Sequence, residues 1–110
     1  MAQTLQEFKA DLFRVLANPV RIRILEALRA GGELTVGEIQ QRLGVEASNV
    51  SQHLAILRQH HLVSARREGT SAWYSVSATD LFQMLDVARA IFEEQLREQS
   101  RMLDEERVSG

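Results

Sequence analysis

The chain has 110 residues, of which 45% are hydrophobic and 25% are charged, and its formal net charge is −2. These values predict one soluble globular domain spanning residues 1–110, and the absence of cysteine excludes disulfides, thiolate metal sites and thiol redox sensing. No apolar run approaches the roughly 20 residues that a membrane helix needs. The N-terminal residues lack the apolar core of a signal peptide, so we expect a cytoplasmic protein with no membrane partner.

Charge is unevenly distributed along the chain. Residues 1–46 carry six basic and six acidic side chains, residues 47–67 carry three arginines and no acid, and residues 78–110 carry eight acids and four arginines. A positively charged segment in the middle of the chain favours binding to the negatively charged backbone of nucleic acid. Because this positive charge is modest, we expect affinity to depend on dimerisation and on backbone amide contacts as well as on charge.

The first third of the chain predicts two helices. Apolar residues recur there with a helical period, at Leu5, Phe8, Leu12 and Val15. Asn18-Pro19 predicts the start of the second helix, because Asn is a good N-cap and proline lacks an N–H that would have no partner at that position. Gly31-Gly32 ends this helix.

Residues 35–59 predict a helix-turn-helix. Thr35 and Glu38 have the spacing of a capping box, and Gly44 suits the left-handed residue of a turn. The next helix, residues 47–59, has an inner stripe formed by Val50, Leu54 and Leu57. Its other face carries small polar side chains, and such a second helix enters the DNA major groove.

Residues 62–76 predict a β-hairpin, because two extended runs flank the polar loop 68–70. Ser77 or Thr79 is expected to cap a long final helix covering residues 78–104, and the residues from Glu105 onward are expected to fray. The predicted fold is therefore mainly α with a small β-hairpin, a winged helix-turn-helix.

Polar side chains on the second helix of this motif and on the hairpin are candidate DNA contacts. Gln and Asn form paired hydrogen bonds with adenine, whereas Ser mostly meets phosphate, so Gln52 is the best candidate for a base contact. The alternatives are a solvated helix face capped by Ser48 and a half-buried structural His53. The predicted DNA-binding residues are Ser48, Asn49, Ser51, Gln52, His53, Arg66, Arg67, Thr70 and Ser71.

Three pairs of neighbouring side chains carry further expectations. Arg66 and Arg67 alternate along a strand, so only one can face DNA fully, and the other is expected to hold the wing through an ion pair with Glu68. One of Trp73 and Tyr74, which alternate on the returning strand, is expected to pack against the core. Arg21 and Arg23 are expected to lie on a solvated face, with contact to the DNA phosphate backbone as the alternative.

The two terminal helices, residues 1–17 and 78–104, carry more apolar surface than one small core needs. Two amphipathic helices at the ends of a short chain most simply bury this excess against a second copy, which predicts a homodimer. A ligand pocket between the helices is the alternative. The predicted dimerisation residues are Leu5, Phe8, Leu12, Leu81, Leu85, Ala88, Phe92 and Leu96.

Residues 8–77 resemble the ArsR (arsenic-repressor) family of bacterial winged-helix repressors. The specific parts are Asn-Pro-x-Arg-x-x-Ile-Leu at residues 18–25, Ser-x-His-Leu-x-x-Leu at residues 51–57, and Leu-Val-x-x-Arg-Arg-x-Gly at residues 62–69. The resemblance implies a homodimer built from the first and last helices that binds an inverted repeat in double-stranded DNA and usually represses. It also implies release of the DNA by an effector.

The chain departs from that family in two respects. Gln40 stands beneath the turn, where a helix-turn-helix usually has a small residue. The cysteine metal sites of many relatives are absent, and Asp80 is followed by Phe82 instead of a histidine-containing ligand pattern. Adjacent His60 and His61 point in different directions and suit a helix C-terminus. We therefore predict no metal and no cofactor, and leave the effector open, including a metal bound by oxygen and nitrogen ligands across a dimer.

The sequence thus favours a sequence-specific DNA-binding regulator, in the form of a homodimeric repressor. A winged helix that only docks other proteins is the alternative, since fold does not fix function, but the acid-free segment 47–67 argues against it. An enzyme is disfavoured, because the chain shows no nucleophile–base pair, no Gly-rich phosphate loop and no paired carboxylates.

Overall fold

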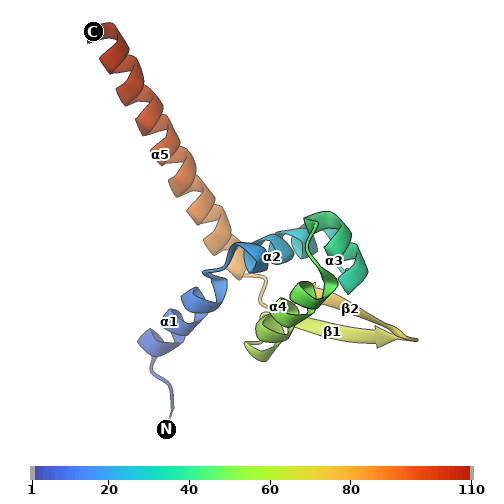
Figure 1. The fold of residues 1–110 in the computed structure, drawn as a ribbon. Coiled ribbons are helices and arrows are strands. Elements are labelled where there is room, and N and C mark those ends of the chain that lie inside the picture. Colours follow the sequence, from blue (N-terminus) through green and yellow to red (C-terminus); the bar gives the residue numbers. More distant parts are fainter. Residues whose placement is uncertain (1, 110) are drawn as a thin grey trace. The chain divides into compact units, whose positions relative to one another are not determined.

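The computed structural model describes residues 2–109, which fall into two compact units divided after Ala78. In chain order the elements are α1 (Leu5–Leu16), α2 (Pro19–Gly31), α3 (Val36–Leu43), α4 (Ala47–Gln59), β1 (Val63–Glu68), β2 (Ser71–Val76) and α5 (Leu81–Ser109). Helices α2, α3 and α4 lie together with the β1–β2 hairpin beside them (Figure 1). The predicted winged helix-turn-helix, mainly α with one small hairpin, is confirmed.

Side-chain caps explain where the first three helices begin. The Asn18 side chain accepts hydrogen bonds from two backbone amides in the first turn of α2, as predicted. Thr35 and Glu38 form the predicted capping box of α3. Thr4 and Glu7 form a second capping box at the start of α1, which we did not predict. Each such cap contributes about 1 kcal/mol to stability.

The core of residues 2–78 lies where α2, α3 and α4 pack on one another and on the hairpin. The predicted inner stripe of α4, Val50, Leu54 and Leu57, is fully buried. Burial of side chains of this size stabilises the fold by about 1.5–3 kcal/mol each. The other buried apolar residues of this unit are Val15, Leu16, Ile24, Leu25, Leu28, Leu34, Ile39, Leu43, Leu62 and Val63.

The hairpin is anchored to the segment before α3. The Leu34 amide donates to the Tyr74 carbonyl oxygen at 3.0 Å, and the Tyr74 amide donates back to the Leu34 carbonyl oxygen at 2.8 Å. At the other end, Glu68 pairs with Ser71, so the turn is two residues long rather than the predicted three. Gly69 has a φ of 62°, which glycine adopts without steric cost at the first position of such a turn.

Helix α5 is one continuous helix of 29 residues that differs from the prediction at both ends. It begins at Leu81, and the Ser77 hydroxyl donates to the His61 carbonyl oxygen at 3.2 Å instead of capping it. At its other end it remains helical through Ser109, so the prediction of fraying from Glu105 is wrong. Exposed ion pairs one turn apart, such as Arg97–Glu94 at 2.7 Å, favour this continuation. Among residues 2–109, every helix is too short or too polar to cross a bilayer.

Candidate nucleic-acid interface

Helix α4 directs a polar face away from the core. Since each helical residue advances by about 100°, Ser48 and Gln52 lie on the side opposite the buried stripe. Both are exposed, as are Asn49 and Ser51 beside them. Gln52 therefore occupies the outermost line of α4, from which its amide can reach a base edge.

Ser48 does not cap α4. The N-cap residue is Glu46, and it makes no side-chain hydrogen bond to the first-turn amides. The alternative interpretation of Ser48 as a cap is therefore wrong, and its hydroxyl stays on the exposed face. The first amides of a helix that lack a side-chain acceptor suit phosphate, because they point outward at the positive end of the helix dipole.

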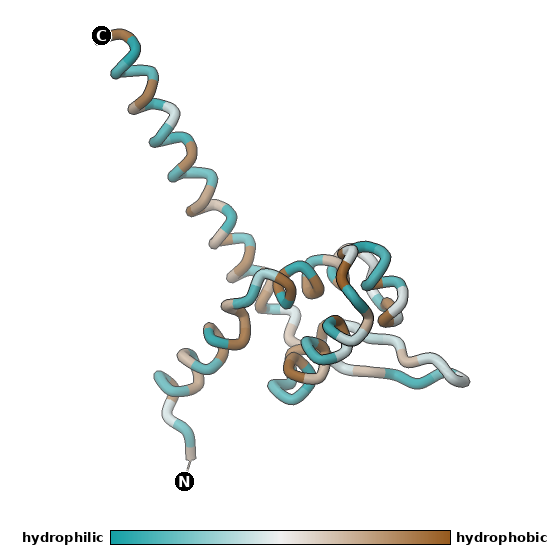
Figure 2. Tube along the Cα trace, viewed as in Figure 1, coloured by the Kyte–Doolittle hydropathy of each residue, from teal (hydrophilic) through white to brown (hydrophobic). Residues whose placement is uncertain are grey.

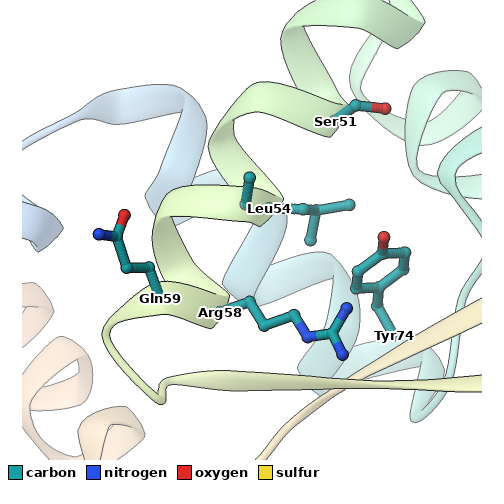
Figure 3. Close-up of a pocket in the computed structure, with 6 residues that line it drawn as sticks. Ser51, Leu54, Arg58, Gln59 and Tyr74 are labelled. Atoms are coloured by element: carbon teal, nitrogen blue, oxygen red, sulfur yellow. The ribbon is translucent and has the colours of Figure 1, made fainter.

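One flank of α4 faces the hairpin across a groove of about 340 Å³. Ser51 and Arg58 line it from α4, and Tyr74 lines it from β2 (Figure 3). Figure 3 shows the Arg58 side chain extending along this groove toward the Tyr74 ring. Sequence reasoning missed Arg58 and Tyr74 as neighbours of the candidate interface. The available signal was the spacing of seven residues from Ser51 to Arg58, which places both on one flank of a helix.

The opposite flank of α4 is held by α2. His53 is half-buried, and its Nδ1 accepts a hydrogen bond from Nε of Arg21 at 3.2 Å. Burial, and secondarily the charge of Arg21, lower the pKa of His53. The acceptor role of Nδ1 in this bond is the one that a neutral imidazole with its proton on Nε2 can fill.

Arg21 is partly buried, contrary to the expectation of a solvated face, whereas Arg23 is exposed as expected. Arg21 also donates from Nη1 to the Val15 carbonyl oxygen at 3.1 Å. Arg23 donates from Nη2 to the Leu43 carbonyl oxygen at 2.7 Å. Both guanidinium groups reach past their own helix to satisfy carbonyl groups at the ends of α1 and α3, which lack partners within their helices.

In the wing, Arg66 and Arg67 point to opposite faces of the hairpin, since Arg66 pairs with Trp73 and Arg67 with Ala72. Arg66 makes two hydrogen bonds to Glu33, from Nε at 3.1 Å and from Nη2 at 3.0 Å, and Nη1 donates to Glu68 at 2.8 Å. The Arg66 guanidinium lowers the pKa of Glu33. The predicted ion pair with Glu68 is confirmed, and the one with Glu33 was missed.

Arg67 lies on the hairpin face that also carries Val63 and Tyr74. Val63 is buried and Tyr74 lines the groove beside α4, so this face is turned toward α4. Arg67 is exposed and makes no ion pair with any residue that the structure describes. Thr70 and Ser71 are exposed at the tip of the hairpin. Trp73 and Tyr74 are both partly buried.

Gln40 and the adjacent pair His60–His61, which the sequence singled out, both lie on the surface of the fold. Gln40 is exposed, which leaves room beneath the turn. His60 is the C-cap of α4, and His61 follows it with a φ of 60°, as the helix-end interpretation of this pair requires. Within residues 2–109 no three His, Asp or Glu side chains are grouped to hold a metal ion.

Comparison with known proteins identifies the family. A model described as a helix-turn-helix domain matches residues 16–64. The uncharacterized HTH-type transcriptional regulator Rv0081 of Mycobacterium tuberculosis is 39% identical, over 99% of this chain and 96% of its own length. Its crystal structure has a TM-score of 0.76 at 40% identity, covering 89% of this chain and 98% of that chain. The chain belongs to the helix-turn-helix transcriptional regulators of the ArsR type.

Members of this family regulate in both directions. The transcriptional activator HlyU of Vibrio cholerae is 36% identical over 74% of this chain and 74% of its own length. The transcriptional repressor SdpR of Bacillus subtilis is 34% identical over 64% of this chain and 78% of its own length. Both relatives are named as transcriptional regulators.

Proposed function

We propose that this protein is a cytoplasmic homodimer that binds an inverted-repeat operator in double-stranded DNA and represses transcription. The observation that carries the proposal is the exposed polar face of α4, centred on Gln52, together with the exposed Arg67 on the hairpin face that is turned toward α4. In a two-fold dimer, two such helices enter successive major grooves roughly 34 Å apart.

The candidate residues divide by role. Gln52 reads a base edge, and Ser48, Asn49 and Ser51 contact phosphates or neighbouring bases. From the wing, three residues contact the DNA backbone beside the base-reading site: Arg67, Thr70 and Ser71. Because its guanidinium is engaged by two carboxylates, Arg66 serves to hold the wing in place. His53 offers only its Nε2 edge, because its Nδ1 is occupied by Arg21.

The two wing arginines give a prediction about salt dependence. Replacing Arg67 with alanine is expected to weaken binding to all DNA sequences and to lower the slope of log affinity against log salt by about 1, because one phosphate contact is lost. Replacing Arg66 is expected to change that slope less, since its charge already faces Glu33 and Glu68. Fluorescence anisotropy at several salt concentrations measures both slopes. Equal slope changes in the two variants would contradict this division of roles.

Apolar side chains on α1 and α5 support the homodimer. Leu5 and Phe8 of α1 are 60% and 54% exposed, and Phe92 and Leu96 of α5 are 60% and 46% exposed. Figure 2 shows apolar segments recurring along α5. Large exposed apolar side chains that recur on one helix face are usually covered by a partner.

The predicted dimerisation residues differ in exposure. Leu81 is only 3% exposed within a single chain. Leu12 and Leu85 are half-buried, and Ala88 is exposed. On α5 the surface open to a partner therefore begins at Leu85. Val87 and Ile91 are also exposed.

We expect Phe92→Asp to convert the dimer to a monomer, because a carboxylate at the centre of the apolar stripe loses its hydration on association. Light scattering after size-exclusion chromatography measures the mass. Ala90→Asp is the matched control, because it adds the same charge on the opposite side of α5, two residues away. A Phe92→Asp protein that keeps the dimer mass would show that α5 is not the interface.

The proposed function is tested by anisotropy binding of the purified protein to the DNA upstream of its own gene, at two salt concentrations, with random DNA as control. Preferential binding that weakens with salt is the expected result. A folded dimer that prefers neither DNA over the other at any salt concentration would favour the alternative, a winged helix that docks other proteins.

A further inference from the structure

Arg21 joins three helices of the DNA-binding unit. From α2, its Nε donates to Nδ1 of His53 on α4 at 3.2 Å, and its Nη1 donates to the carbonyl oxygen of Val15 near the end of α1 at 3.1 Å. We propose that Arg21 is a positioning residue for base recognition, which fixes the rotation of α4 through His53 without touching DNA. This inference rests on the proposed function.

The bond to His53 stands out among the contacts of α4. Among the described residues, His53 is the one α4 side chain that makes a hydrogen bond to another element. The buried stripe of Val50, Leu54 and Leu57 holds α4 against the core through non-directional apolar contacts. On the other flank, Ser51 and Arg58 border the open groove, and neither makes a hydrogen bond across it to any residue in the described part of the chain. The directional restraint on rotation therefore comes from the side of α2.

Rotation of α4 bears directly on base reading. Gln52 adjoins His53 in the chain, so any turn of α4 about its axis that shifts His53 also moves the Gln52 amide. Hydrogen bonds weaken steeply when their angles fall below about 120°, and a paired amide–base contact depends on two of them at once. Phosphate contacts by mobile arginines tolerate the same displacement, because they depend mainly on charge.

Arg21 is also tied to the end of α1, which carries part of the proposed dimer surface. Its bond to Val15 lies at the α1–α2 junction, beside a hollow of about 410 Å³. The other titratable groups that line this hollow are Asp11, Arg14 and His60. If the dimer rearranged and displaced α1, the Arg21 side chain would therefore transmit that displacement to α4.

The link requires a neutral His53, because Nδ1 accepts a hydrogen bond only when it carries no proton. The lowered pKa of His53 agrees with this requirement. Removing Arg21 removes both the donor and one cause of the lowered pKa. We expect Arg21→Ala to raise the pKa of His53, measured by the ¹⁵N shifts of its ring. Arg23→Ala is the matched control, since it removes an equal charge from α2, where the partner is the backbone of Leu43.

DNA binding separates positioning from direct contact. We expect Arg21→Ala to lower the preference for operator over random DNA about tenfold while leaving the salt slope unchanged. Arg21→Lys keeps the charge but cannot make both bonds at once, so it is also expected to lose preference with an unchanged slope. The double variant with His53→Ala is expected to be no worse than the more impaired single variant, because both act through one bond.

Three results would overturn the inference: a slope lowered by about 1 in Arg21→Ala with equal loss on both DNAs, additive effects in the double variant, or an unchanged pKa of His53. Failure of the proposed function gives a different pattern. In that case the wild-type protein itself shows no preference for its operator, whereas failure of this inference alone leaves wild-type preference intact and Arg21→Ala either unimpaired or impaired in one of the three ways just named.

Discussion

Replacing Leu54 with alanine is expected to lower the free energy of unfolding by about 2–5 kcal/mol. Leu54 is 0% exposed and belongs to the stripe that holds α4 on the core. Alanine leaves a cavity there, and the neighbouring helices collapse into it only in part. Urea unfolding followed by circular dichroism measures the change.

Gln59→Ala is the control for this substitution, because Gln59 lies on the same helix but is exposed. Its free energy of unfolding is expected to stay within about 0.5 kcal/mol of the wild type. If Leu54→Ala were equally mild, α4 would not be held by the buried stripe. Operator affinity is also expected to fall in Leu54→Ala, since a loosened α4 presents its polar face in many orientations.

Gln52→Ala is expected to lower discrimination at a single operator position by about 1–3 kcal/mol, because a paired amide–base contact is lost. Its affinity for random DNA and its salt slope are expected to stay unchanged, since Gln52 carries no charge. A panel of operators substituted at each base pair in turn, measured by competition, gives the profile of preference.

The profile distinguishes a base contact from a general loss of fit. Relaxation confined to one position in each half-site supports a base contact by Gln52. Uniform weakening across all positions would place its role in orientation or phosphate contact. Preference identical to the wild type would show that base reading comes from other residues of α4.

Short-range patterns predicted most of the fold, because they act within one or two helical turns. The Asn18 cap, the Thr35–Glu38 capping box and the buried stripe of α4 each depend on residues at most seven positions apart. The alternation of Arg66 and Arg67 also followed from strand geometry alone.

Side-chain partners distant in the sequence were not predicted. Glu33 and Arg66 are separated by 33 residues, and Arg21 and His53 by 32. No periodicity links such positions, since each guanidinium extends on a long flexible arm to whichever acceptor the packing brings within reach. For the same reason the sequence predicted a solvated face for Arg21 and Arg23, although both donate hydrogen bonds to groups on other elements.

The anchoring of the hairpin at Leu34–Tyr74 has a consequence for how such a regulator diversifies. The backbone bonds at this point and the Arg66–Glu33 ion pair fix the wing without involving its two-residue turn. The turn is exposed, so loops of other lengths can be grafted there at little entropic cost. Under the proposed function, exchange of the wing tip would raise or lower affinity for the DNA backbone, while operator choice would stay encoded in α4.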